Sequence, residues 1–388
     1  MFYSDETAMR AGRYIQQTTG YRAFYPAPLP PEPPVRLEGS IQKRLSDADR
    51  ALGRLDGSIT NLPNPDLFVL MYVRKEAVLS SQIEGTQSSL QDVLAAEARI
   101  FNADRPSDVR EVINYVDALR YGLERLKSLP VSARLFKEIH KRLLKGVRGS
   151  RLTPGELRRS QNWIGPGGCT INEATFVPPP PEKAAEALSQ LEKFLHEDND
   201  LPLLVTIGLA HAQFETIHPF LDGNGRIGRL LITFLLCEVA VLAQPVLYLS
   251  HYFKRYRTTY YEKLQAVRER GDWEGWIEFF LTGVIDVSKK AAATARRIQQ
   301  LREAHRALIA GSLGYAAANG FRLLDEAFKR PILSVKDVIA VTGTSFTAAN
   351  KLIARLTEAG LFREITGQVR NRRFRYEPYV QLFFEDGE

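Results

Sequence analysis

The chain has 388 residues, 44% hydrophobic and 25% charged, which is typical of a soluble protein with two or three folded domains. Its two cysteines are too few for a disulfide framework, and neither an apolar signal core nor a membrane span is evident, so we expect a cytoplasmic protein without membrane contact. The net charge of +7 permits an acidic partner or nucleic acid but requires neither.

The N-terminal 145 residues change from an irregular arm to a helical region. Residues 25–35, YPAPLPPEPPV, predict an extended polyproline arm. From about residue 40 to 145, apolar residues recur at helical spacing, which predicts a series of amphipathic helices. One of these helical stretches follows Pro63 and Pro65 and runs to about residue 85.

The stretch 158–181 interrupts the helical pattern. Glycines and prolines divide it, and Ile171, Phe176 and Val177 are residue types that favour strands. We predict a short surface hairpin here. Helices over 182–196 and 202–217 then lead to the densest group of polar residues in the chain.

That group is the segment 218–229, HPFLDGNGRIGR, which opens an apolar helix. Gly223, Asn224 and Gly225 predict a tight turn, because glycine accepts positive φ at little cost and asparagine tolerates it. A glycine-rich turn at the start of a helix points backbone N–H groups into one concavity, where the helix dipole favours an anion.

Four side chains around this turn suit phosphate-transfer chemistry. Arg226 and Arg229 are three residues apart, so they lie close together on the first turn and can donate to phosphate oxygens. The Asp222 carboxylate can hold Mg²⁺ together with phosphate oxygens and water. The His218 imidazole can accept a proton from a hydroxyl near neutral pH. Together these groups predict transfer of a nucleotide phosphate to an alcohol.

The tail from about residue 330 predicts a separate unit. Ser334 and Asp337 are spaced like a capping box at the start of a short helix, and residues 344–359 continue at helical spacing. Residues 363–376 contain five arginines around a glycine, which predicts a basic two-stranded wing. We interpret this order as a winged helix-turn-helix unit that contacts DNA, or alternatively supports dimerisation or presents a substrate.

The segment 218–229 resembles the signature of the Fic family, HPFx[DE]GNGRxxR, at every defined position. Most Fic proteins transfer AMP from ATP to a Ser, Thr or Tyr hydroxyl of a protein and release pyrophosphate. The resemblance implies that His218 is the general base and that Asp222 holds Mg²⁺. It also implies that the ATP phosphates are contacted by the residues Gly223, Asn224, Gly225, Arg226 and Arg229.

A second resemblance concerns inhibition. Ser80, Glu84 and Gly85 fit the family's inhibitory motif, [ST]xxxE[GN]. The resemblance implies that the Glu84 carboxylate pairs with Arg229 and competes with the γ-phosphate of ATP for that guanidinium. Because this chemistry depends on positioning, such competition would hold the enzyme inactive.

The resemblance also implies how the target segment and the adenine ring of ATP are bound. In Fic proteins a β-hairpin flap at the position of residues 158–178 binds the target segment by strand addition. Relatives line the adenine pocket with residues from the region downstream of the signature, where Tyr248 and Tyr256 are our candidates. The opposing interpretation is that both tyrosines only pack a helix surface.

We therefore expect a mainly α fold: a Fic-type helical bundle with a small β-hairpin flap, followed by a C-terminal winged helix domain. The expected units are residues 1–115, with the inhibitory helix, 116–290, the catalytic core, and 291–388. Our leading hypothesis is an autoinhibited protein adenylyltransferase that uses ATP and Mg²⁺ and modifies a protein hydroxyl, its own included. The alternatives are a DNA-binding regulator with a nucleotide-sensing core, and transfer of UMP or phosphocholine. We also consider a homodimer.

Overall fold

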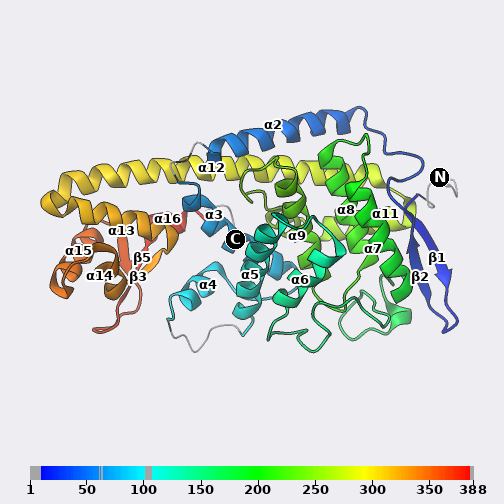
Figure 1. Ribbon diagram of the computed structural model, residues 1–388, viewed down its shortest axis with the longest axis horizontal. Helices are drawn as coiled ribbons and strands as arrows, with labels where there is room; N and C mark the ends of the chain where they lie inside the picture. Colours follow the sequence, from blue (N-terminus) through cyan, green and yellow to red (C-terminus); the bar gives the residue numbers. More distant parts are fainter. Residues whose placement is uncertain (1–9, 61, 63, 101–106, 385–388) are drawn as a thin grey trace.

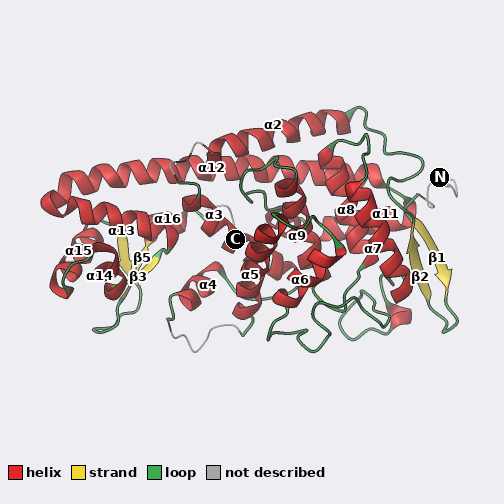
Figure 2. Ribbon diagram, in the orientation of Figure 1, coloured by secondary structure: helices red, strands yellow, loops and turns green. Residues whose placement is uncertain are grey.

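The computed structural model describes residues 10–60, 62, 64–100 and 107–384. Helices dominate, and two small antiparallel sheets lie at opposite ends of the long axis (Figure 2). Within these ranges no helix is both long enough and apolar enough to cross a bilayer. The mainly α fold expected from the sequence is confirmed.

The core is a bundle of helices that surrounds α8 and α9 (Figure 1). The helices of this part are α3 (Asp66–Ile83), α4 (Leu90–Glu97), α5 (Val109–Leu126), α6 (Ala133–Leu143), α7 (Pro181–His196), α8 (Leu203–Ile217), α9 (Asn224–Glu238), α10 (Ser250–Arg255) and α11 (Arg257–Arg270). Nearly every residue of α8 and α9 is buried, because most of α8 and the second half of α9 are apolar and the polar start of α9 is covered by neighbouring helices. The loop between these two helices is therefore held at both ends by the most buried elements of the fold.

One continuous helix extends along the molecule (Figure 1). Helix α12 (Trp273–Leu313) has 41 residues, and α2 (Ser40–Thr60) packs along it. The expected boundary at residue 290 falls inside α12, so the same helix belongs to the core and to the C-terminal part.

The N-terminal region contains a β-hairpin that the sequence did not predict. Strands β1 (Gly12–Gln16) and β2 (Arg22–Pro26) pair antiparallel, and the polyproline arm begins only after them. The Phe24 N–H donates to the Val177 carbonyl at 2.9 Å, and the Phe24 ring packs on Phe176. The hairpin thus braces the predicted flap, in which only one β-bridge, Ile164 with Phe176, forms around a 3₁₀ turn (Ile171–Glu173).

The C-terminal unit combines helices with a three-stranded sheet in the order β3-β5-β4. Its elements after α12 are the short 3₁₀ turn η2 (Gly314–Ala316), α13 (Ala317–Lys329), β3 (Ile332–Ser334), α14 (Val335–Thr342), α15 (Phe346–Glu358), β4 (Phe362–Glu364), β5 (Arg373–Tyr376) and α16 (Glu377–Gln381). Ser334 and Asp337 form the predicted capping box at the start of α14. The two helices and the β4–β5 pair lie where the sequence predicts them, whereas β3 was not predicted.

Candidate functional site

His218 follows α8 directly and adopts a left-handed backbone conformation, with φ 49° and ψ 60°. Such a conformation is unfavourable for a non-glycine residue and persists only where neighbours fix it. The Arg158 Nε donates to the His218 carbonyl at 2.9 Å. Asn224 closes the loop, because its side chain bonds both the N–H and the carbonyl of Phe220, each at 2.8 Å. The imidazole is therefore held at a fixed place beside the start of α9.

The local environment keeps the His218 imidazole neutral. Its Nδ1 lies 3.4 Å from the Glu215 carbonyl, which can only accept, so Nδ1 carries the proton and Nε2 has a free lone pair. Burial and the charges of Arg268 and Arg158 lower the pKa of His218 to about 4. At neutral pH this side chain is consequently a proton acceptor.

The start of α9 forms the tight glycine turn predicted from the sequence. Gly223 caps the helix with a φ of 79°, a conformation that favours glycine. A Cβ at Gly225 would lie 2.2 Å from the Glu84 Oε1, so any side chain at this position would displace the Glu84 carboxylate. The carboxylate of Glu84 therefore lies directly against the first turn of α9, where backbone N–H groups and the helix dipole favour negative charge.

The buried Arg229 side chain is bound by the last turn of α3. Its Nε donates to the Ser80 Oγ at 2.8 Å, and its Nη2 donates to the Ser80 carbonyl at 3.0 Å. Nη2 also donates to the Glu84 Oε1 at 2.7 Å. Although burial opposes ionisation, the Arg229 charge and hydrogen bond keep the pKa of Glu84 below its ordinary value. The structure thus brings Ser80, Glu84 and Arg229 together, and Gly85 follows with a φ of 95°.

Arg226 is fully buried and is oriented by a residue that the sequence did not reveal. Its Nη1 donates to the Glu111 Oε2 at 3.1 Å, and its Nη2 lies 3.5 Å from the Asp222 Oδ1. Its Nε has no hydrogen-bond partner among the described residues. Glu111 lies on the first turn of α5, far from the signature in sequence, and no motif marks it.

Asp222 fits a metal that arrives together with phosphate ligands. Its Oδ1 accepts the Gly223 N–H at 2.6 Å, and about a quarter of the side chain, 26%, is exposed. In the described part of the chain, no group of three or more His, Cys, Asp or Glu residues could hold a metal ion. A single carboxylate with phosphate oxygens and water is a usual Mg²⁺ environment, so Asp222 would hold the ion only with a nucleotide present.

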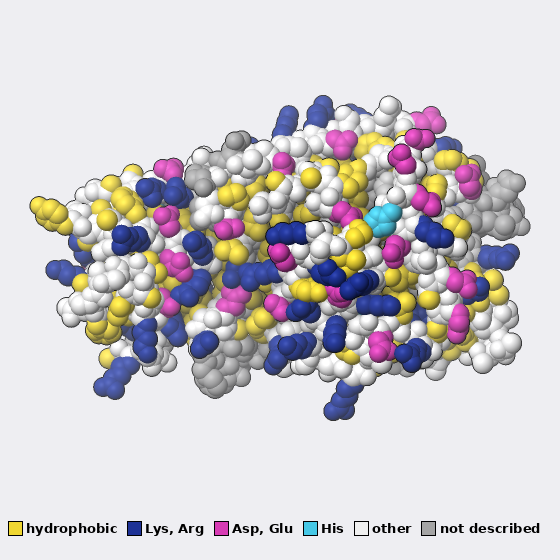
Figure 3. All heavy atoms as spheres, in the orientation of Figure 1, with side chains coloured by type: hydrophobic (Ala, Val, Ile, Leu, Met, Phe, Trp, Pro, Cys, Tyr) yellow, Lys and Arg dark blue, Asp and Glu magenta, His cyan; other side chains and the backbone are white. Residues whose placement is uncertain are grey.

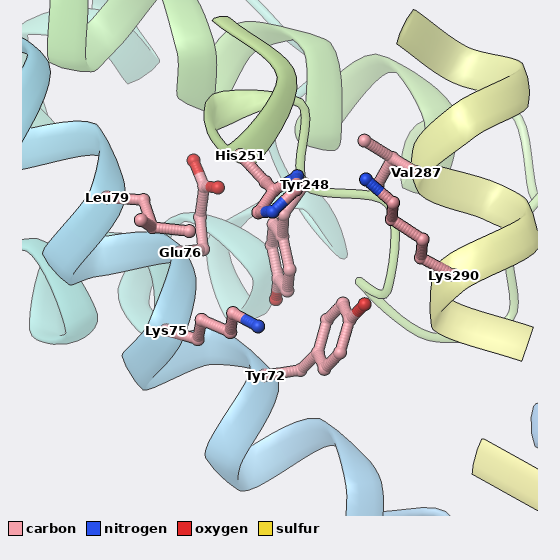
Figure 4. A pocket seen from close by; sticks show the side chains of 8 residues that line it. All are labelled: Tyr72, Lys75, Glu76, Leu79, Tyr248, His251, Val287 and Lys290. Carbon is pink, nitrogen blue, oxygen red and sulfur yellow. The ribbon is translucent and has the colours of Figure 1, made fainter. Parts of the chain in front are cut away.

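The two tyrosines predicted for the adenine pocket lie in different surroundings. Tyr248 lines a cavity of about 20 Å³ that includes none of residues 218–229 and has room for about one water (Figure 4). Tyr256 is 41% exposed and its ring packs on Tyr252. Burial and the charge of Glu84 raise the pKa of Tyr261, a neighbouring tyrosine that the sequence did not single out. The pattern of tyrosines could not distinguish these positions, because periodicity does not reveal which ring faces the turn.

The cavity in Figure 4 also contains a buried carboxyl group on α3. The Glu76 Oε1 accepts hydrogen bonds from the Tyr115 and Ser250 hydroxyls, whereas its Oε2 has no partner in the described residues. Burial raises the pKa of Glu76 to about 7. The acid is thus neutral below this pH and must ionise inside the protein above it.

This carboxyl group predicts a pH-dependent loss of stability. Its folded-state pKa exceeds the ordinary value, so its contribution is complete below about pH 4.5 and disappears as the pH rises through 7. We expect Glu76→Gln to leave the free energy of unfolding nearly unchanged at pH 5 and to raise it by up to about 3 kcal/mol at pH 8. Urea unfolding at both pH values measures the difference. A variant that is equally destabilised at both would refute the neutral carboxyl group.

Comparisons with known proteins agree with this geometry. Residues 42–124 match the Fic/DOC family N-terminal region, and residues 130–236 match the Fic/DOC family. The chain is similar to curated proteins named protein adenylyltransferase Fic. It is 28% identical to that of Drosophila grimshawi over 197 residues, 50% of this chain and 36% of the relative. It is 27% identical to that of Drosophila melanogaster over 254 residues, 63% of this chain and 45% of the relative. The chain thus spans less than half the length of these relatives.

Two solved structures share the fold. A Fic family protein from Desulfovibrio desulfuricans G20 aligns with a TM-score of 0.57 at 19% identity, covering 88% of this chain and 97% of the other. A Fic domain containing signaling protein from Bacteroides thetaiotaomicron aligns with a TM-score of 0.51 at 18% identity, covering 66% of this chain and 97% of the other. The complete signature spans the loop after α8 and the first turns of α9, and the chain belongs to the Fic family.

Proposed function

We propose that the chain is a protein adenylyltransferase that transfers AMP from ATP to a Ser, Thr or Tyr hydroxyl of a protein, its own hydroxyls included. The observation that carries this proposal is the neutral His218, fixed with a free Nε2 beside the start of α9. A protein that only sensed nucleotides would need the anion-binding turn but not a base. The name of the curated relatives supports the same reaction.

In the proposed reaction, His218 Nε2 removes the proton of the target hydroxyl as its oxygen attacks the α-phosphorus of ATP. A bond forms between that oxygen and the α-phosphorus, the bond from the α-phosphorus to the bridging oxygen breaks, and pyrophosphate leaves. The unpartnered Arg226 Nε and the N–H groups at the start of α9 stabilise the phosphate charge. Mg²⁺, held by Asp222 and phosphate oxygens, would neutralise charge on the leaving group.

We further propose that α3 holds this reaction off. Arg229 is free to orient the γ-phosphate only when Glu84 leaves, because Ser80 and the Glu84 carboxylate occupy its Nε and Nη2 donors. Misplacement of the γ-phosphate misaligns the α-phosphate for in-line attack, and small errors of position are costly for such reactions. The ion pair between Glu84 and Arg229 supports this regulation.

The donor is tested by mass spectrometry of the Glu84→Gly protein after exposure to Mg²⁺ and a mixture of ATP, GTP, UTP, CTP and CDP-choline. We expect an AMP adduct on a Ser, Thr or Tyr side chain, in the protein or in added cell extract. An adduct of UMP or phosphocholine would show that UTP or CDP-choline, and not ATP, is the donor. Absence of every adduct from both protein and extract would refute the transferase.

A second function is DNA binding by the C-terminal unit. Its supporting observation is that the first turn of α15 and the β4–β5 loop are exposed, with Ser345, Lys351 and Arg370 on this surface. We propose that α15 enters the major groove and that the wing contacts phosphates, as in winged helix proteins. A mobility shift with genomic fragments at physiological salt tests this role. Equal, weak binding to every fragment would limit it to nonspecific charge attraction.

A further inference from the structure

A second cavity lies between the core and the C-terminal unit. Its volume is about 450 Å³, within the range of small-molecule sites. One wall comes from α3 and the end of α4, and the other from β3, the start of α14 and β5. Figure 1 shows α4 facing the C-terminal unit, and Figure 3 shows Lys and Arg side chains where the two parts meet.

The charged residues around this cavity are mostly basic. Five are cations, namely Arg74, Arg99, Arg330, Lys336 and Arg373. Two are anions, namely Glu97 and Asp337, so the lining has an excess of three positive charges. Two units of the protein thus contribute like charges to one concave space, which costs energy unless an anion neutralises them.

Both acids of the lining already have partners. The Arg74 Nε donates to the two Glu97 carboxylate oxygens at 3.0 and 2.8 Å. Asp337 accepts from Arg330 and also caps α14, since its Oδ2 accepts the Ser334 N–H at 2.7 Å. Neither carboxylate is therefore left to neutralise further cations of the cavity.

The other three cations have no such compensation. Among the described residues, the side chains of Arg99, Lys336 and Arg373 form no hydrogen bond or ion pair. Arg74, by contrast, is 6% exposed and fixed at the wall formed by α3, where its Nη1 also donates to the Leu70 carbonyl at 2.7 Å. The cavity therefore combines one fixed, buried guanidinium with three cations that can close on a ligand.

We propose that this cavity binds a small molecule with one or more phosphate groups. Arginine forks and a lysine ammonium are the side chains that proteins use for phosphate, and four of them can surround one group here. A volume of about 450 Å³ suits a small molecule and is too small for a nucleic acid duplex. The ligand contacts α3, the helix that ends at Glu84, and it touches the C-terminal unit at the same time.

The test is calorimetric titration with inorganic pyrophosphate in metal-free buffer at physiological salt. The cavity variant replaces Arg99, Lys336 and Arg373 by alanine. The matched control variant removes equal charge from three exposed positions outside the cavity, replacing Lys193, Arg296 and Arg322 by alanine. Both variants keep the nucleotide turn, so any binding there is common to all titrations.

We expect the wild type and the control to show the same saturable binding of pyrophosphate. The variant that lacks the three cavity cations should lose this binding or show an affinity at least tenfold lower. Identical titrations for the two variants would overturn the proposal. Lys336→Glu alone, at an exposed position of α14, should weaken the same binding at least tenfold, with thermal unfolding as the check on its fold. Unchanged binding in that protein would also count against the site. None of these outcomes depends on AMP transfer, so the site and the proposed reaction can fail separately.

Discussion

AMP incorporation by the Glu84→Gly protein is expected to exceed that of the wild type by about ten- to a hundredfold. The substitution removes the carboxylate that accepts from Arg229 Nη2 at 2.7 Å and frees the space against Gly225. Hydrogen bonds between charged groups contribute about 1.5–3 kcal/mol, which corresponds to this range of rates if the freed guanidinium orients the γ-phosphate. The backbone at residue 84 is compatible with glycine, so the fold should persist.

Incorporation of radiolabelled AMP into the protein measures this effect, with two further variants as controls. Glu84→Gln keeps the size of the side chain but loses its charge, so its rate should lie between the other two. Glu124→Gly changes an exposed glutamate of α5 and should leave the rate at the wild-type level. If Glu84→Gly is labelled no faster than the wild type, the proposed inhibition by Glu84 is refuted.

The His218→Ala substitution is expected to reduce transfer by about 10²–10⁴-fold when placed in the Glu84→Gly protein. The imidazole is the group in the turn with a free nitrogen lone pair at neutral pH, as its lowered pKa and its Nδ1 contact indicate. Phosphate binding should persist, because the N–H groups of α9 and the two arginines are unchanged. The loss should therefore appear in kcat far more than in KM.

Single-turnover labelling and ATP binding, measured on the same protein preparation, separate these effects. Thermal unfolding verifies that the left-handed position at residue 218 tolerates alanine, and His218→Asn, which suits that conformation better, provides a second protein. Transfer that continues at the parent rate in both variants would show that another group accepts the proton. Loss of ATP binding together with transfer would instead indicate that His218 maintains the turn.

The signature segment shows how far the sequence leads. Its glycines and their place before an apolar helix were sufficient to predict the turn, because these are local properties. The partners that fix it are distant in sequence: Glu111 orients Arg226, and Arg158 holds the His218 carbonyl. Periodicity identifies the buried side of each helix but not which residue of another helix it meets, so neither contact could be predicted.

The contact between Glu84 and Arg229 illustrates a different limit. Glu84 and Arg229 are 145 residues apart, and only the family resemblance linked them. Even that comparison left the contribution of the Ser80 carbonyl unstated, since a motif records side chains and not main-chain acceptors. The N-terminal hairpin escaped prediction for a related reason: its pairing with Val177 depends on a segment far along the chain.

Helix α12 gives the molecule a fixed internal length. Its 41 residues span about 60 Å without interruption, and α2 stiffens much of that span by packing along it. A partner bound by the C-terminal unit would therefore reach the turn at the start of α9 only if its own dimensions match this length. If the proposed transfer holds, the length of α12 selects target proteins by their size as well as by the sequence around the modified hydroxyl.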